Sequence, residues 1–486
     1  MKILFYSLYA NFLPPFGTQL ELMKREKDAG NEIFVVRCKG VFLSCHANLE
    51  HHPVKCARCI DRSDFFFKQL GIPESNIYSI ETSAESAGFL VPYFHNTDEL
   101  LNFKYKGFEL GRGVASTLIS RSRELEIDSL RFGELIDIYL RMAIDAFESL
   151  QKIIDQILPD LVVLYNGRQP EDRPLVLLAE QRGIKYASYV AGSNIQKFRI
   201  FKNGVVHYLH SFQQHINELL LNHESTPEII EIEGAKWFDR VAESLSKDTP
   251  NYTKSQQKGL LPVSFNRQKI NIAIFNSSED EMKTFQDWKT PLYQNQNEAI
   301  RKICEIFKDK KDIQFYLRIH PNLQSVLNTQ MQEINSFNFQ NLEIIPADSP
   351  VNTYSLMDAC DKVITFGSST GAEATHRGKP SILIGKSFYD HLDCVYKIND
   401  YHELLALIID KNLKPKPAFN ARKYGFYLSN HGEEHLFLEF REDGHYFNNQ
   451  KLEKIRFGTV IRIMVDFYLQ TSKWLKIKRI LNKIKI

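Results

Sequence analysis

The sequence lacks any long uninterrupted apolar run. None of its 486 residues belongs to a stretch that approaches the roughly 18 apolar residues of a membrane-spanning helix. The apolar start, residues 1–9, contains Ser7 and lacks the small-residue cleavage site of a signal peptide. We therefore expect a first β-strand at this position and a cytoplasmic protein.

Excess charge of either sign is also absent. The chain has 61 Lys and Arg against 59 Asp and Glu, for a formal net charge of +2. This balance gives no reason to expect a nucleic-acid partner. Apolar residues make up 43% and charged residues 25%, which is ordinary for a globular protein. A chain of this length exceeds what one core usually holds, so two domains are expected.

Cysteine is scarce, with seven in the chain, but four of them are clustered. Two of the four have the Cys-x-x-Cys spacing with which two thiolates can bind one tetrahedral metal ion. A reducing cytoplasm disfavours structural disulfides. The spacing is compatible with a structural zinc site, and a redox-active pair or reduced loop cysteines are the alternatives. The expected ligands are Cys38, Cys45, Cys56 and Cys59, with His46 among the residues that could substitute.

Residues 363–385 form the most informative local pattern. An apolar run at 363–366 predicts a buried strand, which Gly367 ends. Ser368, Ser369 and Thr370 follow, and each can cap a helix, while Gly371 leaves the backbone uncovered. Hydroxyls and free N–H groups at a helix N-terminus suit a phosphate. An ordinary capped strand–helix turn is the alternative.

A second pattern precedes it, at residues 315–322. A short apolar strand that contains Arg318 ends at His320-Pro321, because proline cannot continue a central strand. In open α/β sheets, ligands bind outside the carboxyl ends of the strands. We therefore expect His320 and the turn at 368–370 to face one crevice.

These two motifs carry a family resemblance. Arg318-Ile-His-Pro321, followed by residues 367–374 and by Gly378-Lys-Pro380, resembles the C-terminal half of bacterial capsule-polysaccharide glycosyltransferases. The wider group includes Kdo transferases, bacterial sialyltransferases and CDP-glycerol glycerophosphotransferases. The match covers residues 271–389 and is specific for nucleotide-sugar enzymes but not for one sugar. It implies the α/β fold called GT-B, in which two Rossmann-like domains face each other across a cleft.

The resemblance also implies a donor site. A nucleotide sugar, preferably linked to CMP or CDP, would bind the second domain, and His320 would stabilise the departing phosphate without a metal ion. Pro346 stands where such enzymes pack the donor base, and Glu373 could bind ribose hydroxyls. The expected donor-binding residues are Arg318, His320, Pro346, Ser368, Ser369, Thr370, Gly371 and Glu373.

The first domain is expected to hold the acceptor. Thr18 and Glu21 match a capping box, which predicts a loop over residues 10–17 and a helix over 18–29. In GT-B enzymes this first loop faces the acceptor, so Gly17 is a candidate for binding and Glu21 for catalysis, with a cap as the alternative role for Glu21. The base that activates the acceptor is not identified securely.

Two further loops are candidates for substrate binding. The predicted strand at 161–164 ends in a polar loop, and the strand at 270–275 precedes an acidic one. In the first loop a surface cluster of Arg and carboxylate side chains is the alternative, and in the second a general base is another role. The residues concerned are Asn166 and Arg168, with Glu171, Asp172 and Arg173, and then Ser278 and Glu279.

Composition divides the chain into three parts. A polar stretch at 246–268 is the best linker, so we expect an acceptor-side domain at 1–250 and a donor domain at 268–445. Residues 446–486 are expected to form C-terminal helices with a basic tail, in which Trp474, Ile477, Leu481 and Ile484 share one helical face. This tail could rest on the anionic inner-membrane surface. The alternative is a last helix that packs on the first domain.

The sequence thus predicts a glycosyltransferase of bacterial surface polysaccharide, either capsule or lipopolysaccharide. Its acceptor would be a lipid-linked or polysaccharide chain. A nucleotide-sugar epimerase of similar fold and a nonenzymatic partner in polysaccharide assembly or export are the alternatives.

Overall fold

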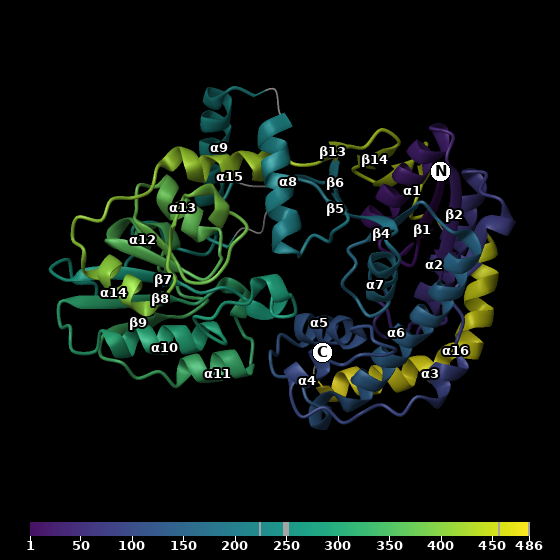
Figure 1. The fold of residues 1–486 in the computed structure, drawn as a ribbon, viewed down its shortest axis with the longest axis horizontal. Helices are drawn as coiled ribbons and strands as arrows, with labels where there is room; N and C mark the ends of the chain where they lie inside the picture. Colours follow the sequence, from purple (N-terminus) through teal and green to yellow (C-terminus); the bar gives the residue numbers. More distant parts are fainter. Residues whose placement is uncertain (223–224, 246–251, 455–456, 485–486) are drawn as a thin grey trace. The chain divides into compact units, whose positions relative to one another are not determined.

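The computed structural model describes residues 1–222, 225–245, 252–454 and 457–484. They form two compact units (Figure 1). Unit 1 consists of Met1–Val206 and Gly432–Ile486, and unit 2 of His207–His431. The division therefore comes before the predicted linker, whose residues 246–251 lie outside the described residues. The chain also returns to unit 1 at Gly432, so the last segment is not a separate part.

Unit 1 is built on a seven-stranded sheet in the order β13-β6-β5-β4-β1-β2-β3. The five strands from β5 to β3 are parallel, while β6 and β13 are antiparallel at one edge. The central strands are almost wholly apolar, as expected for parallel strands covered on both faces. The strands are β1 (Lys2–Tyr6), β2 (Glu32–Arg37), β3 (Ile77–Ser79), β4 (Leu161–Tyr165), β5 (Lys185–Ala191), β6 (Lys197–Lys202) and β13 (Glu433–Glu434).

The helices of unit 1 before Val206 connect these strands. They are α1 (Leu13–Asp28), α2 (Pro53–Gln69), α3 (Ala84–Gly88), α4 (Thr97–Leu101), α5 (Leu110–Ser122), α6 (Ser129–Ile157) and α7 (Arg173–Arg182). The predicted capping box at Thr18 is wrong, because α1 already begins at Leu13. Pro14 and Pro15 occupy its first turn, where a missing N–H costs nothing. The Thr18 hydroxyl instead donates to the carbonyl of Pro14 at 3.0 Å.

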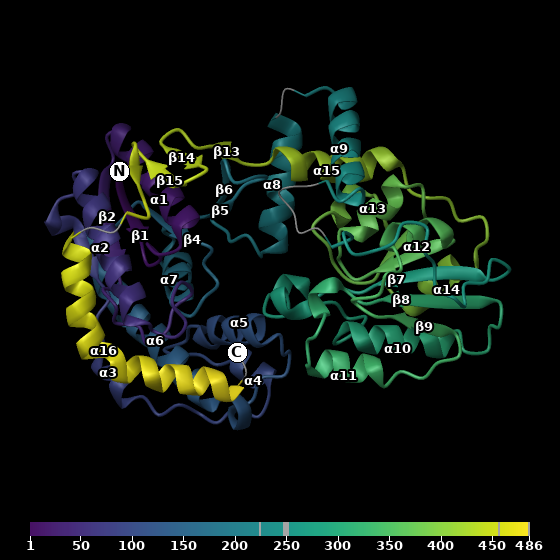
Figure 2. The ribbon, with the colours of Figure 1, turned by 180° about the vertical axis from the view of Figure 1, so that it is seen from behind.

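The C-terminal segment of unit 1 adds a small antiparallel sheet and a long helix. The sheet has β14 (Leu438–Arg441), β15 (Gly444–Phe447) and β16 (Gln450–Lys451), and the helix is α16 (Phe457–Ile484). This helix packs on α2 and α6 (Figure 2), and it buries Ile477, Ile480, Leu481 and Ile484. The apolar face of the tail is therefore turned toward the protein, as the packing alternative predicts.

Unit 2 contains a six-stranded parallel sheet in the order β12-β11-β10-β7-β8-β9. Its strands are β7 (Ile270–Phe275), β8 (Ile313–Arg318), β9 (Leu342–Ile345), β10 (Lys362–Thr365), β11 (Ser381–Leu383) and β12 (Tyr396–Lys397). Its helices are α8 (Leu209–Asn222), α9 (Pro227–Ala242), α10 (Gln296–Ile306), α11 (Thr329–Asn335), α12 (Thr353–Ala359), α13 (Thr370–His376), α14 (Tyr401–Ile409) and α15 (Ala418–Asn430).

Successive side chains along each strand point to opposite faces of the sheet, and both faces of this sheet are apolar. Ile272 and Ile274 of β7 pack into the core that includes Ile300 of α10, whereas Ala273 packs into the core that includes Met357 of α12. Unit 2 is thus a three-layered α/β unit, and the predicted α/β fold with two Rossmann-like sheets is confirmed. Within the described residues, no helix is long and apolar enough to cross a membrane.

Candidate functional site

The candidate donor site lies at the carboxyl edge of the unit 2 sheet. Strand β7 lies between β10 and β8, so the loops that follow these three strands are neighbours. Adjacent strands are about 4.8 Å apart, which places the ends of β10 and β8 about 10 Å from each other. The sheet therefore gathers His320, residues 276–280 and the turn at 368–370 along one short edge, where α/β sheets bind ligands.

His320 is held in a defined orientation. Its backbone N–H donates to Oδ1 of Asn276 at 2.8 Å, and its ring Nδ1 accepts the backbone N–H of Asn322 at 3.1 Å. A neutral ring that accepts at Nδ1 carries its hydrogen on Nε2. The ring is partly exposed and meets Tyr252 edge-on, with 5.4 Å between centroids. His320 can therefore donate a hydrogen bond through Nε2.

The turn before α13 is stabilised by a buried carboxylate. Oγ of Ser369 donates to Oε1 of Glu373 at 2.7 Å, and the Tyr354 hydroxyl donates to Oε2 at 2.8 Å. Glu373 is only 4% exposed, and burial raises its pKa. Both carboxylate oxygens of Glu373 accept hydrogen bonds inside unit 2, so Glu373 holds the turn in place. This differs from the expectation that Glu373 binds ribose hydroxyls.

The remaining residues of this turn have two kinds of environment. Oγ1 of Thr370 is buried and has no hydrogen-bond partner among the described residues, whereas Oγ of Ser368 accepts the N–H of Thr370 at 3.4 Å. Gly371 is buried, and a Cβ there would lie 2.3 Å from the hydroxyl oxygen of Tyr389. Glycine is thus needed for close packing, and the expectation that its backbone is uncovered is corrected.

Arg318 supports a neighbouring loop. Its guanidinium donates to the carbonyl of Pro346 and, at 3.2 Å, to that of Ser349. The side chain is buried, which lowers its pKa to about 10. Arg318 therefore fixes the loop after β9 that contains Pro346, the expected position of the donor base.

The loop after β7 supplies two buried polar atoms that have no hydrogen-bond partner among the described residues. Oε1 of Glu279 accepts the N–H of Gln296 at the start of α10, at 2.9 Å, and burial raises the pKa of this carboxyl to about 7. Oε2 of Glu279 and Nδ2 of Asn276 are buried and have no partner among the described residues. The Ser278 hydroxyl donates to the carboxylate of Asp280. Asn276 was not singled out from the sequence, although its position directly after β7 is a signal for it.

In unit 1, Glu21 has a different environment from the one expected. It is fully buried and accepts the backbone N–H groups of Leu436, Phe437 and Leu438 at 2.6–3.0 Å. Arg25 also donates to it, at 2.7 Å. Glu21 thus ties the C-terminal segment to α1. A Cβ at Gly17 would lie 2.5 Å from the Leu438 side chain, so Gly17 also serves this packing.

The loop after β4 does lie at the carboxyl edge of the unit 1 sheet. Asn166 adopts φ 59° there, and Nη2 of Arg168 donates to Oγ of Ser120 at 3.1 Å. Glu171 and Asp172 are 2% and 1% exposed, so the alternative of a surface cluster does not hold for them. The Tyr9 hydroxyl donates to Oδ1 of Asp172 at 2.8 Å, a contact that the sequence pattern did not indicate.

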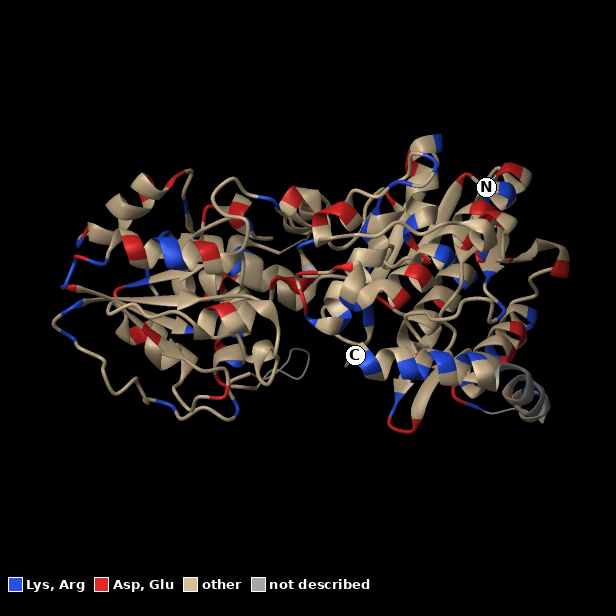
Figure 3. Ribbon diagram, turned by 90° about the horizontal axis from the view of Figure 1, so that it is seen from below, with Lys and Arg blue, Asp and Glu red and all other residues tan. Residues whose placement is uncertain are grey.

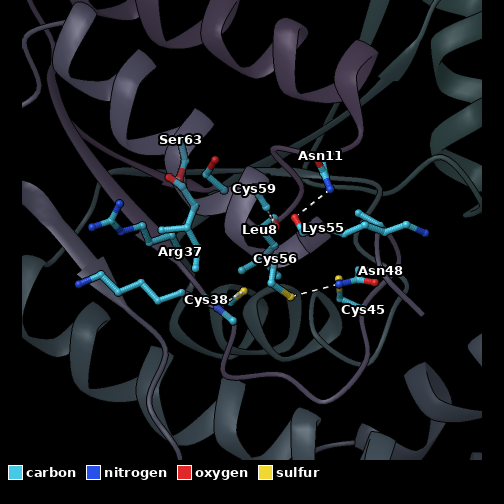
Figure 4. A pocket seen from close by; sticks show the side chains of 15 residues that line it. Leu8, Asn11, Arg37, Cys38, Cys45, Asn48, Lys55, Cys56, Cys59 and Ser63 are labelled. Atoms are coloured by element: carbon cyan, nitrogen blue, oxygen red, sulfur yellow. Dashed lines mark hydrogen bonds between the residues drawn. The ribbon is translucent and has the colours of Figure 1, made fainter. Parts of the chain in front are cut away.

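The four clustered cysteines line one cavity of about 30 Å³ (Figure 4). Cys38 directly follows β2, and Cys56 and Cys59 are on α2. Burial raises the pKa of Cys38, Cys45 and Cys59, which disfavours the thiolate that a metal would need. No three His, Cys, Asp or Glu side chains of the described residues are arranged to hold a metal ion. The zinc prediction is therefore not supported, and none of the four cysteines forms a disulfide with another described residue.

Several solved structures resemble the chain at low similarity. The β-Kdo 2,4 transferase KpsC of Thermosulfurimonas dismutans is 11% identical, with 55% of this chain and 79% of that chain covered and a TM-score of 0.36. The β-Kdo 2,7 transferase of the same KpsC is 12% identical, with 58% and 80% covered and a TM-score of 0.32. The UDP-GlcNAc 2-epimerase of Methanocaldococcus jannaschii is 10% identical, with 87% and 98% covered and a TM-score of 0.26. Such scores carry no argument about activity.

Sequence comparison is more specific. No curated protein matches the chain. Residues 284–395 match the sequence model of a family described as "Capsule polysaccharide biosynthesis protein". This segment contains His320, Arg318 and the turn at 368–370. Unit 2 is therefore similar, over residues 284–395, to the capsule polysaccharide biosynthesis family.

Proposed function

We propose that the protein is a glycosyltransferase that moves a sugar from a nucleotide sugar to a bacterial surface polysaccharide. One observation carries this proposal. Both motifs lie within the segment that matches the capsule family, and the parallel sheet of unit 2 brings His320 and the turn at 368–370 to the carboxyl ends of β8 and β10, the two strands that flank β7. These groups are hydrogen-bond donors of the kind that bind a phosphate.

The proposed chemistry follows the charge that develops on the departing nucleotide. When the bond between the sugar and the phosphate breaks, negative charge collects on the phosphate oxygens. Nε2–H of His320 and the hydroxyls of Ser368 and Thr370 would donate to these oxygens. Preorganised donors of this kind are each worth about 3 kcal/mol in the transition state. The step uses these donors and needs no metal ion.

The donor would extend from this phosphate site to the loop after β9. Arg318 fixes that loop through the carbonyls of Pro346 and Ser349, and the base would pack against Pro346. The resemblance of the two motifs makes CMP or CDP the first nucleotides to test. Nδ2 of Asn276 and Oε2 of Glu279 are buried without a partner among the described residues, and these two side chains would face the sugar part of the donor.

Unit 1 would bind the acceptor, a lipid-linked or polysaccharide chain. Its last helix would at the same time hold the enzyme at the inner surface of the cytoplasmic membrane. Between Lys473 and Ile484 this helix contains five cations and no acidic residue, and Figure 3 shows Lys and Arg recurring along it. Leu475 is exposed on the same helix. Exposed cations beside an exposed apolar side chain suit an anionic lipid surface.

The decisive experiment incubates the full chain with CMP-, CDP-, UDP- and GDP-linked sugars. A transferase releases nucleotide only when a capsule-type acceptor is added, whereas an epimerase interconverts the free nucleotide sugar. Thermal-shift measurements identify the nucleotide, because a bound ligand raises the melting temperature. A chain that binds none of the four nucleotides and releases none of them contradicts the proposal and favours a nonenzymatic assembly partner.

A further inference from the structure

An exposed apolar loop lies between α3 and α4 in unit 1. Residues 89–94 read Phe-Leu-Val-Pro-Tyr-Phe, which are six consecutive apolar or aromatic residues. Leu90 is 90% exposed and Tyr93 is 57% exposed. Single exposed apolar side chains are common on protein surfaces, whereas a contiguous group of them marks a surface that binds a partner. The apolar loop at 89–94 is therefore a candidate interaction surface.

The apolar loop is held at both ends. The rings of Phe89 and Phe94 pack edge-on against Phe103, with 6.0 and 5.7 Å between the ring centroids. The guanidinium of Arg141 on α6 donates to the carbonyl of Phe89 at 3.0 Å. The backbone N–H of Phe94 donates to Oγ of Ser129, and the N–H of Ser129 donates back to the carbonyl of Phe94, both at 2.8 Å. The exposed middle of the loop thus rests on a fixed base, so binding a partner orders little additional chain.

Helix α6 extends this apolar surface toward α16. Leu130 directly follows Ser129 and is 87% exposed, so it lies beside the end of the loop at Phe94. Glu134 lies one turn further along the same side of α6, and it pairs with Lys483 of α16 at 3.3 Å. Figures 1 and 2 show the last turns of α16 running past α3 and α4. The apolar surface and the basic end of α16 therefore adjoin within unit 1.

The charges of this region are divided between the two elements. Lys476 and Arg479 on α16 are exposed and form no ion pair with a described residue. Near the apolar loop, Glu99 and Asp128 each accept a backbone N–H group at 2.8 Å. Attraction to an anionic surface therefore comes from α16, and the loop adds apolar area rather than positive charge.

We propose that the apolar loop and Leu130 insert into an anionic lipid bilayer while α16 contacts its headgroups. A bilayer accounts for both the apolar protrusion and the cations next to it, because it offers acyl chains beneath a negatively charged surface. Tyr93 suits the boundary between the two, where tyrosine is enriched. Neither contact alone gives stable binding, since membrane anchoring usually needs two signals. That the inserted enzyme meets a lipid-linked acceptor rests on the proposed function, whereas the insertion does not.

The test titrates the full chain with vesicles of phosphatidylcholine that contain phosphatidylglycerol, and flotation measures the bound fraction. The wild type should bind, and Leu90→Gln should raise the Kd roughly tenfold, because one leucine no longer gains by leaving water. This substitution changes no charge, so the dependence of the Kd on salt should remain that of the wild type. Leu90→Trp should bind at least as tightly as the wild type, since tryptophan favours the membrane interface.

Leu158→Gln provides the matched control. Leu158 is also an exposed leucine of unit 1, at 70%, but it follows the other end of α6. This helix has 29 residues and is about 44 Å long, so Leu158 lies far from the apolar loop. The control variant should bind vesicles as the wild type does. All these leucines are exposed, so the melting temperature of each variant should equal that of the wild type.

The proposal is overturned if the wild type does not bind these vesicles, or if Leu90→Gln and the double variant with Leu130→Gln bind as tightly as the wild type. A dimer of the wild type that Leu90→Gln dissociates, seen by analytical ultracentrifugation, also overturns it, because a second copy then covers the loop. If reversing the charges of α16 leaves binding unchanged while Leu90→Gln weakens it, insertion of the loop stands and the role proposed for α16 fails. Nucleotide release with a soluble acceptor needs no bilayer, so a failure of the proposed transferase activity is seen separately.

Discussion

Burial and hydrogen-bond partners separate residues that look alike in the sequence. Glu21 and Glu279 both follow a predicted strand and loop, and both were candidates for chemistry. Glu21 is saturated by four donors, which leaves it no capacity for a substrate. Glu279 accepts one N–H and keeps one buried oxygen without a partner among the described residues. Such differences depend on contacts from distant parts of the chain, which no local pattern reveals.

For His320 we predict a loss of turnover that exceeds the loss of binding. In His320→Ala, kcat should fall roughly ten- to a thousandfold, with a smaller change in nucleotide affinity, because the donated hydrogen bond matters most as charge builds on the phosphate. Steady-state kinetics and nucleotide titration measure the two effects. His402→Ala, which changes an exposed histidine on α14, is the control. Equal losses in kcat and affinity would mean that His320 only binds.

Glu21 should instead contribute to the stability of the fold. Glu21→Ala leaves the backbone N–H groups of Leu436, Phe437 and the buried Leu438 without their acceptor and Arg25 without its partner, so the free energy of unfolding should fall by about 3 kcal/mol. Urea unfolding measures this change. Asp28→Ala on the same helix removes only an exposed pair with Lys24 and should cost less than about 1 kcal/mol. A folded, fully stable Glu21→Ala protein without activity would restore the catalytic assignment.

The raised pKa of Glu279 predicts a pH-dependent stability. Its pKa is raised from the ordinary 4.5 to about 7, so the folded state holds this proton more tightly than the unfolded state. The contribution of protonated Glu279 to the free energy of unfolding is fully present below pH 4.5 and is lost as the pH rises to 7. Glutamine does not titrate, so Glu279→Gln does not lose this contribution. The free energy of unfolding of the variant, relative to that of the wild type, should therefore rise by up to about 3 kcal/mol between pH 4.5 and 7. Urea melts of unit 2 at several pH values measure it.

The control for this window is Glu305→Gln, which changes an exposed carboxylate on α10. Its stability difference from the wild type should not vary with pH in the same way. A Glu279→Gln protein whose relative stability is the same at both ends of the window would show that Glu279 is not held in a buried, protonated state.

At the scale of elements, the boundaries were harder to predict than the elements themselves. Strands such as β7, β8 and β10 are short apolar runs and were located from sequence, as was the turn after β10. The start of α1 was missed because Pro14 and Pro15 look like loop residues, although proline is favoured in a first helical turn. The sequence left open whether the apolar face of α16 contacts a membrane or packs on the protein. The structure shows that this face packs on α2 and α6.

Because Ile477, Ile480, Leu481 and Ile484 of α16 are buried, the proposed membrane contact should be mainly electrostatic. Lys476, Arg479 and Lys483 have i, i+3, i+7 spacing and so lie along one side of the helix. Changing all three to Glu should abolish flotation with vesicles that contain phosphatidylglycerol, and the wild type should not float with pure phosphatidylcholine. Reversal of the exposed Lys308, Lys310 and Lys311 of unit 2 is the control. Unchanged flotation of the α16 variant would contradict the proposal.

At the scale of the whole molecule, the sequence predicted two α/β units but not how the chain divides between them. The parallel order of each sheet follows from alternating strand and helix patterns, which are local. The division depends on residues 432–454, whose short strands carry weak signals of their own. Leu438 and Leu452 join the core of unit 1 only because the chain returns there.

This division makes unit 2 the part that should fold alone. Residues 207–431 are continuous and contain a complete six-stranded sheet with a core on each face. Residues 1–206 lack Leu438, Phe447 and Leu452, each of which is at most 3% exposed in the unit 1 core and is worth about 2 kcal/mol when buried. They also lack the N–H groups that satisfy Glu21. We therefore expect 207–431 to melt cooperatively and to bind the same nucleotide as the full chain, with a similar thermal shift.

Residues 1–206 alone should show no cooperative transition, whereas 1–206 joined to 432–486 by a flexible linker should regain one. Circular dichroism measures these melts. A cooperative melt of 1–206 alone would show that residues 432–486 are not needed for the unit 1 fold.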